Sequence, residues 1–195
     1  MKDRALAPAT AALAGRVAPV WVTAVALALS VGAGVAASLG LALTSVACWL
    51  AGRVADGLDG PVARRTATAS DLGGYLDMVA DTIGYALVPL GIAHGQANSA
   101  TWAACALLLA TFYLNTISWT YLAAIAEKRA TGARHHGGTT SVHMPAGLIE
   151  GTETIVFYTA MLLLPTQATV LFVSMATLVL VTVAQRVTWA AKTLR

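Results

Sequence analysis

The sequence predicts an all-α integral membrane protein with six transmembrane helices and an N-terminal juxtamembrane amphipathic helix. Of its 195 residues, 57% are hydrophobic and only 11% are charged, and the mean hydropathy of +0.71 is far above that of ordinary soluble proteins. The apolar residues form runs close to the length of about 20 residues that a helix needs to cross a bilayer. Short polar breaks separate these runs and leave no room for a separate soluble domain. We therefore expect one membrane domain over residues 1–195.

The elements follow one another with short connections. Residues 1–17 carry basic side chains but lack the apolar core and cleavage site of a signal peptide, so we interpret them as a juxtamembrane amphipathic stretch. After them, six apolar runs predict spans at residues 19–38, 41–55, 72–93, 100–124, 146–164 and 168–185.

The connections between the spans alternate in charge. Gly40 and the breaks at 94–99 and 165–169 contain no Lys or Arg, whereas the loops at 56–71 and 127–145 do. Because Lys and Arg are enriched in cytoplasmic loops, we expect both termini and these two loops to face the cytoplasm. Topology thus accounts for the net charge of +3, and we find no sign of nucleic-acid binding. The expected location is the cell (plasma or inner) membrane.

Four aspartates lie at the cytoplasmic ends of the second and third predicted spans. Asp56 and Asp59 are three residues apart and Asp77 and Asp81 are four apart, so each pair projects from one face of its helix. A charge inside a span costs about 3 kcal/mol on insertion scales, so such carboxylates usually line a polar cavity. Neighbouring carboxylates repel unless cations neutralise them, and oxygen ligands suit Mg²⁺ or Mn²⁺. The aspartates therefore predict a two-ion metal site.

Residues 56–81 resemble the signature of the CDP-alcohol phosphotransferases, also called the CDP-alcohol phosphatidyltransferase family. The run reads Asp-x2-Asp-Gly-x2-Ala-Arg-x8-Gly-x3-Asp-x3-Asp. All eight fixed positions match: Asp56, Asp59, Gly60, Ala63, Arg64, Gly73, Asp77 and Asp81.

The resemblance implies a metal-dependent transferase of phospholipid biosynthesis. Asp81 would act as general base and as a metal ligand together with Asp56, Asp59 and Asp77. It would take a proton from a polar alcohol, which attacks the β-phosphorus of a CDP-alcohol and releases CMP; CDP-diacylglycerol is the expected donor. Similar proteins form homodimers, so we expect a homodimer in the lipid bilayer. The CDP moiety would be bordered by Asp56, Gly60, Ala63, Arg64, Ser70 and Gly73, although Ser70 can equally be a plain cap of the third helix.

The acceptor is expected near the loop after the fourth span and the start of the fifth. Glu150 and Glu153 are three residues apart at that start. They either face the acceptor or only favour the positive end of the helix dipole. Arg134 in the basic loop either binds a phosphorylated acceptor or serves only as a topology determinant. The identity of the acceptor stays open.

A divalent-cation membrane transporter is the alternative function, because intramembrane aspartate pairs also coordinate ions along translocation pathways. Transport routes place polar groups near the bilayer midplane, with interrupted helices and repeat symmetry. These aspartates instead crowd one end of their helices beside Arg64. The enzyme is therefore the favoured interpretation.

Overall fold

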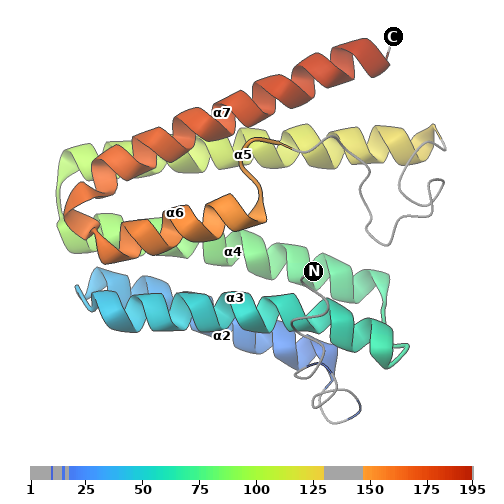
Figure 1. Ribbon diagram of the computed structural model, residues 1–195, viewed down its shortest axis with the longest axis horizontal. Coiled ribbons are helices and arrows are strands. Elements are labelled where there is room, and N and C mark those ends of the chain that lie inside the picture. The colour runs from blue at the N-terminus through green and yellow to red at the C-terminus, as the bar shows by residue number, and fades with distance from the viewer. Residues whose placement is uncertain (1–9, 11–14, 16–17, 130–146, 195) are drawn as a thin grey trace. The chain divides into compact units, whose positions relative to one another are not determined.

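The described part of the chain is entirely helical. The computed structural model describes Thr10, Gly15 and residues 18–129 and 147–194, except for the side chain of Asp59, and these residues contain no strand. The predicted juxtamembrane helix at 1–17 lies almost wholly outside this part. The elements in order (Figure 1) are α2 (Pro19–Ser38), α3 (Ala42–Arg65), α4 (Asp71–Gln96), α5 (Ser99–Lys128), α6 (Gly151–Leu163), the 3₁₀ helix η1 (Pro165–Gln167) and α7 (Ala168–Thr193).

The predicted spans match these helices unequally. Helix α2 has the predicted bounds, whereas α3 continues to Arg65, ten residues beyond the predicted end at 55. The prediction stopped where charges begin, but charged side chains can lie on an exposed helix face without ending the helix. Helix α6 begins at Gly151 instead of 146 and has only 13 residues.

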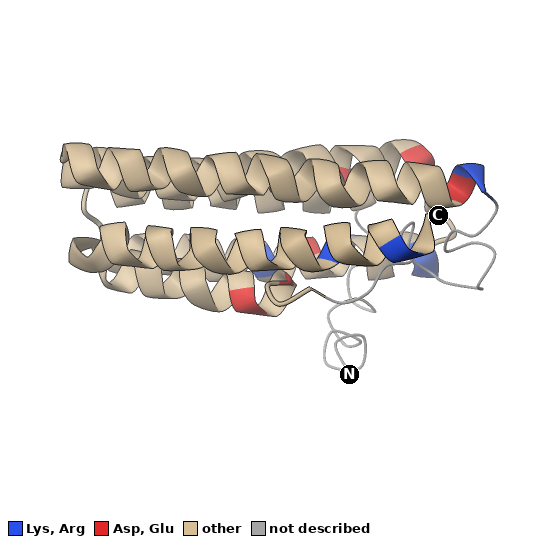
Figure 2. Cartoon of the chain, turned by 90° about the horizontal axis from the view of Figure 1, so that it is seen from above, with Lys and Arg blue, Asp and Glu red and all other residues tan. Residues whose placement is uncertain are grey.

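Among the described residues, four helical segments are long and apolar enough to cross a membrane: α2, α4, α5 and the stretch Pro165–Thr193 that includes α7. The all-helical membrane fold is thus confirmed in this coarser form. Helices α3 and α6 are not among the four, because α3 carries five charged residues and α6 is short. Helix α2 has no charged residue, and the charged residues of α3, α4, α5, α6 and α7 lie toward one end of each helix (Figure 2).

The tertiary contacts divide the chain into two compact units. The first comprises Met1–Trp102 and Tyr158–Ala168, and the second comprises Ala103–Phe157 and Thr169–Arg195. In the first unit, α2 packs against both α3 and α4.

Small residues allow α2 and α4 to approach closely. A Cβ atom added at Gly91 would overlap the carbonyl oxygen of Gly34, and one at Gly95 would lie 2.7 Å from the carbonyl oxygen of Ala37. Helix α3 is joined to α2 by Ser45, whose hydroxyl donates to the Ala33 carbonyl at 2.6 Å. Close backbone approach through small residues is typical of helix packing in membranes.

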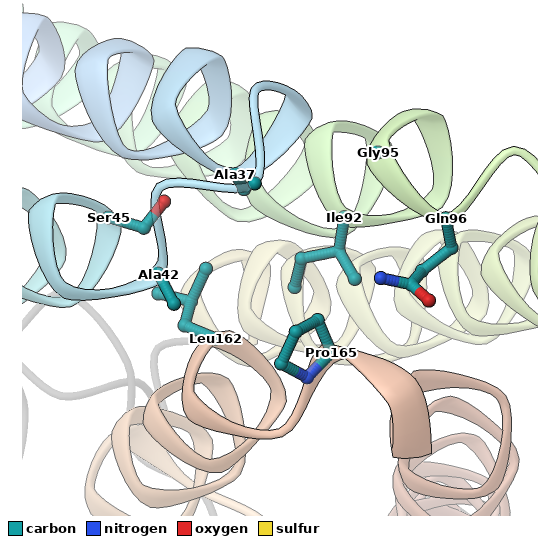
Figure 3. A pocket seen from close by; sticks show the side chains of 9 residues that line it. Ala37, Ala42, Ser45, Ile92, Gly95, Gln96, Leu162 and Pro165 are labelled. Atoms are coloured by element: carbon teal, nitrogen blue, oxygen red, sulfur yellow. The ribbon is translucent and has the colours of Figure 1, made fainter.

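A small cavity lies where α2 ends, α3 begins and α4 ends (Figure 3). Its volume of about 40 Å³ is far below the roughly 300 Å³ of a typical ligand pocket. Ser45 and Gln96 supply its polar side chains. The aspartates lie at the other ends of α3 and α4, so this cavity is separate from the predicted site.

Candidate active site

The signature occupies the last part of α3 and the first part of α4. A short turn through Ala67, whose φ is +53°, joins the two helices. Ser70 then begins α4 as its N-cap, because its Oγ accepts a hydrogen bond of 3.1 Å from the Gly73 amide. The cap interpretation of Ser70 is confirmed, while its contact with a nucleotide stays a prediction.

Two of the predicted metal ligands meet at one nitrogen atom. Nη1 of Arg53 donates to Oδ1 of Asp81 at 2.6 Å and lies 3.7 Å from Oδ2 of Asp56. Asp56 lies on α3 and Asp81 on α4, so carboxylates from both helices of the signature converge. Their side chains are 22% and 30% exposed, whereas that of Arg53 is 5% exposed. The carboxylates are therefore within reach of an entering molecule, and the guanidinium lies beneath them.

An aromatic cluster surrounds the guanidinium. The carbon Cζ of Arg53 lies 4.8 Å from the ring centre of Trp49 and 5.0 Å from that of Tyr85, distances at which a cation is attracted to the ring face. Nη1 also donates to the Tyr85 hydroxyl at 3.3 Å, and Nη2 donates to Ser30 Oγ at 3.2 Å. Tyr158 of α6 stacks on Trp49 and donates its hydroxyl to the Tyr85 carbonyl at 2.6 Å.

Sequence reasoning missed Arg53, although a signal was present. An arginine inside the predicted span 41–55, one helical turn before Asp56, is an intramembrane charge beside a carboxylate. The contacts with Ser30 and Tyr85 could not be predicted, because they come from other helices.

The remaining metal ligands are only partly described. Asp77 is half-buried on α4, one turn before Asp81, and Asp59 lies on α3 with its side chain outside the description. Among the described side chains, no group of three His, Cys, Asp or Glu residues lies close enough to hold an ion. Asp56 of α3 and Asp81 of α4 both contact the guanidinium of Arg53, and carboxylate oxygens are the ligands that hard divalent cations prefer.

The predicted CDP-binding residues line the same end of the two helices. A Cβ at Gly60 would lie 3.2 Å from Arg64 Nη1, and one at Gly73 would lie 3.3 Å from Ser70 Oγ, so a larger residue at either place would crowd a neighbour. Ala63 is half-buried and Arg64 is exposed on α3. An exposed guanidinium beside small residues is suited to binding phosphate oxygens.

The acceptor candidates belong to the second unit or lie outside the description. Arg134 is among the residues 130–146 that the structure does not describe. Glu150 Oε1 accepts from the Gly147 amide at 2.8 Å, and Glu153 Oε2 accepts from the Glu150 amide at 3.1 Å. Both glutamates therefore bind backbone amides where α6 begins, as capping residues do. Their contact with an acceptor stays a prediction.

Polar side chains of α7 hold the chain that leads into α6. Thr182 Oγ1 accepts from the Ile149 amide at 3.0 Å, and Gln185 Oε1 accepts from the Leu148 amide at 3.2 Å. One residue further, Arg186 Nη1 donates to Asn115 Oδ1 on α5 at 2.5 Å. Sequence reasoning missed this group too, although three polar residues spaced three and four apart in an apolar helix were a signal.

An all-helical membrane fold with an aspartate signature on two consecutive helices defines the class of membrane phosphoalcohol transferases. A family model described as CDP-alcohol phosphatidyltransferase matches residues 16–192. The chain belongs to that family, whose members are enzymes that transfer substituted phosphate groups.

A curated relative is similar to part of the chain. The inner membrane protein YnjF of Escherichia coli (strain K12) is 35% identical over 128 residues, which are 66% of this chain and 61% of that protein. The chain thus matches less than two thirds of the length of this relative.

Solved structures show the same fold. Phosphatidylinositol phosphate synthase (PgsA1) of Mycobacterium tuberculosis with CDP-DAG bound is 21% identical, with a TM-score of 0.69 over 95% of this chain and 89% of that one. A second structure of that synthase, in complex with manganese and citrate, has a TM-score of 0.65 at 21% identity and covers 95% of this chain and 85% of that one.

Proposed function

We propose that this protein transfers a phosphatidyl group from CDP-diacylglycerol to a hydroxyl of a polar alcohol and releases CMP, in phospholipid biosynthesis. The observation that carries the proposal is the convergence of Asp56 and Asp81 from the two signature helices, with Arg64, Gly60 and Gly73 at the same end. The family match over residues 16–192 supports it. The relative that contains CDP-DAG supports the choice of donor.

The reaction can be written in full. The acceptor oxygen forms a bond with the β-phosphorus of the CDP-alcohol, the bond from that phosphorus to the bridging oxygen breaks, and the electron pair leaves with CMP. Asp81 accepts the proton of the attacking hydroxyl, and its exposure allows the hydroxyl to approach. Arg64 binds phosphate oxygens, and the lack of side chains at Gly60 and Gly73 lets a phosphate come close to the backbone of the helices.

Asp56, Asp59, Asp77 and Asp81 are the residues that would hold two Mg²⁺ or Mn²⁺ ions. When bound, the ions neutralise the pyrophosphate oxygens and so facilitate departure of CMP. The protein's own task is then to hold donor and acceptor in line, which is the main contribution to such a transfer.

We further propose six spans, with both termini and the aspartates on the cytoplasmic side. The location of the charged residues of α3, α4, α5, α6 and α7 toward one end of each helix supports this arrangement (Figure 2). Helix α3 would then cross the bilayer with its charged end at the cytoplasmic surface. The two compact units would form one catalytic domain, since the family match spans both. Exposed apolar side chains such as Leu43 and Tyr113 support contact with lipid or with the second subunit of a homodimer.

Arg134, Glu150 and Glu153 would contact the acceptor alcohol. Glu150 interacts electrostatically with Arg186. The region where α6 begins therefore offers both a negative and a positive charge to a polar molecule. A carboxylate could bind the hydroxyls or the amine of an acceptor, and an arginine could bind its phosphate.

The experiment that tests the proposal is product analysis with purified protein in lipid nanodiscs. CDP-diacylglycerol, Mg²⁺ or Mn²⁺ and a panel of phosphorylated and unphosphorylated alcohols are supplied, and lipid products are identified by mass spectrometry. We expect one class of alcohol to yield a new phospholipid together with an equal amount of CMP. If no alcohol yields a product and the protein also fails to bind CDP but carries divalent cations across vesicle membranes, the transporter replaces the enzyme.

A further inference from the structure

Arg53 is a charged group of the site to which the reaction above assigns no role. Its guanidinium lies beneath the carboxylates of Asp56 and Asp81, nearly closed off from solvent. A buried charge is tolerated only where partners compensate for its lost hydration. Its two carboxylate partners are both residues that the transfer reaction uses, so the placement links Arg53 to the reaction.

The position of the guanidinium is determined from three helices. Ser30 on α2 accepts from Nη2, Tyr85 on α4 accepts from Nη1 and contributes a ring, and Trp49 on α3 contributes a second ring. The backbone carbonyl of Tyr85 in turn accepts a hydrogen bond from the hydroxyl of Tyr158. The planar guanidinium has contacts at both terminal nitrogens, Nη1 and Nη2, and with two rings. It cannot move aside without losing several of these contacts.

The guanidinium of Arg53 contacts the two carboxylate oxygens of Asp81 unequally. The short contact of 2.6 Å is with Oδ1, so Oδ2 is the oxygen that Arg53 leaves for other partners. A general base works efficiently when a third group orients it toward the proton that it accepts. The same nitrogen lies 3.7 Å from Asp56, so one positive charge also reduces the repulsion between the two carboxylates.

We propose that Arg53 is a positioning residue of the transfer reaction. It holds Asp81 through Oδ1 so that Oδ2 accepts the proton of the acceptor alcohol, and its charge keeps the carboxylates of α3 and α4 together before divalent ions bind. The inference rests on the proposed function, and it adds a residue that the signature does not contain.

The first test removes one support of the guanidinium and leaves every charge in place. Ser30→Ala deletes the acceptor of Nη2, and Ser45→Ala is the matched control, because both serines are fully buried and donate to a backbone carbonyl. We expect kcat for CMP release to fall about tenfold in Ser30→Ala with an unchanged KM for the donor, since small displacements of a reacting group reduce rates strongly. Ser45→Ala should keep the wild-type kcat. Equal kcat values in both variants would overturn the positioning role.

The second test separates charge from geometry at Arg53. Melting temperatures are measured in EDTA and in saturating Mn²⁺, together with kcat, for Arg53→Met and Arg53→Lys. In Arg53→Met we expect a larger drop in melting temperature without metal than with it, because only Mn²⁺ then neutralises the repulsion between the carboxylates. We also expect a loss of kcat of about a hundredfold. Arg53→Lys should restore the melting behaviour but not kcat, since one ammonium group cannot replace a planar fork.

Each result decides the matter. If Arg53→Met lowers both melting temperatures equally and Arg53→Lys keeps the wild-type kcat, Arg53 only fills space and the inference is wrong. If Arg53→Met does not fold, Arg53→Lys and Ser30→Ala still decide the question by their kcat values. If the wild-type protein itself neither responds to Mn²⁺ nor releases CMP, the proposed function fails, and the role of Arg53 falls with it.

Discussion

At the scale of single residues, the structure describes the surroundings of Asp81, the proposed general base. Its carboxylate is partly exposed, lies on the rigid helix α4 and accepts a short hydrogen bond from Arg53. The acidic residue Asp71 lies on the same helix but is exposed in its first turn. Asp71 therefore serves as a control for substitutions of Asp81.

The Asp81→Asn substitution should abolish turnover and largely preserve donor binding. The amide can still accept a hydrogen bond from Arg53 but cannot take up a proton, so kcat should fall by at least about a hundredfold. CMP release gives kcat, and calorimetric titration with CDP gives the affinity, which should change only a few-fold. Asp71→Asn is the control and should behave as wild type. Substantial turnover by Asp81→Asn would remove the base assignment.

Glu150→Gln tests the acceptor contact at a capping residue. Glutamine keeps an oxygen that can accept from the Gly147 amide, so the start of α6 is preserved and only the charge is lost. We expect the KM for the acceptor, or the choice among acceptors, to change by about tenfold, as loss of a charged hydrogen bond does. The KM for the donor should not change. If neither acceptor parameter responds, Glu150 is a helix cap and no more.

At the scale of elements, sequence pattern predicted the apolar helices well and the polar ends poorly. Helix α2 has the predicted bounds, because an uninterrupted apolar run defines both of its ends. Helix α3 runs beyond its apolar part, since Asp56 and Arg64 do not interrupt the backbone. The start of α6 depends on Thr182 and Gln185 of α7, which no local pattern reveals. The aspartates were predictable from spacing, whereas the surroundings of Arg53 required the tertiary structure.

The contact between α2 and α4 predicts a stability effect at Gly91. Gly91→Ala places a methyl group against the carbonyl oxygen of Gly34, and backbone atoms cannot move aside as a flexible side chain can. We expect a loss of about 1–3 kcal/mol, as for overpacked cores, seen as a lower melting temperature in detergent. Gly74→Ala is the control, because its methyl group would meet open space. A Gly91→Ala protein that melts like wild type would contradict the close approach of the two helices.

At the scale of the whole molecule, the distribution of charge predicts the side of the membrane on which the aspartates lie. Asp56, Asp81 and the turn at 66–70 belong to one end of α3 and α4, and the connection between α4 and α5 belongs to the other end of α4. The proposed membrane orientation therefore predicts the side from which the water-soluble substrate enters.

Cysteine labelling tests this orientation. In a background without Cys48 and Cys105, Ser99→Cys and Ala69→Cys each place a thiol at an exposed site, at the first residue of α5 and before α4 respectively. A membrane-impermeant maleimide applied to intact cells should label Ser99→Cys and should label Ala69→Cys only after the cells are opened, because the connection between α3 and α4 faces the cytoplasm in the proposed topology. Labelling of Ala69→Cys in intact cells would invert the proposed topology.

The central claim is that the carboxylates of α3 and α4 form a phosphatidyl transfer site. The most direct test follows the phosphorus atom that is transferred. CDP-diacylglycerol labelled in its β-phosphate is incubated with the wild-type protein in nanodiscs, a panel of alcohols and Mg²⁺ or Mn²⁺. We predict that the label appears in a new lipid, that CMP is unlabelled and equal in amount, and that EDTA stops both. Label that stays in the donor with every alcohol, or that is released as a water-soluble phosphate, would contradict the claim.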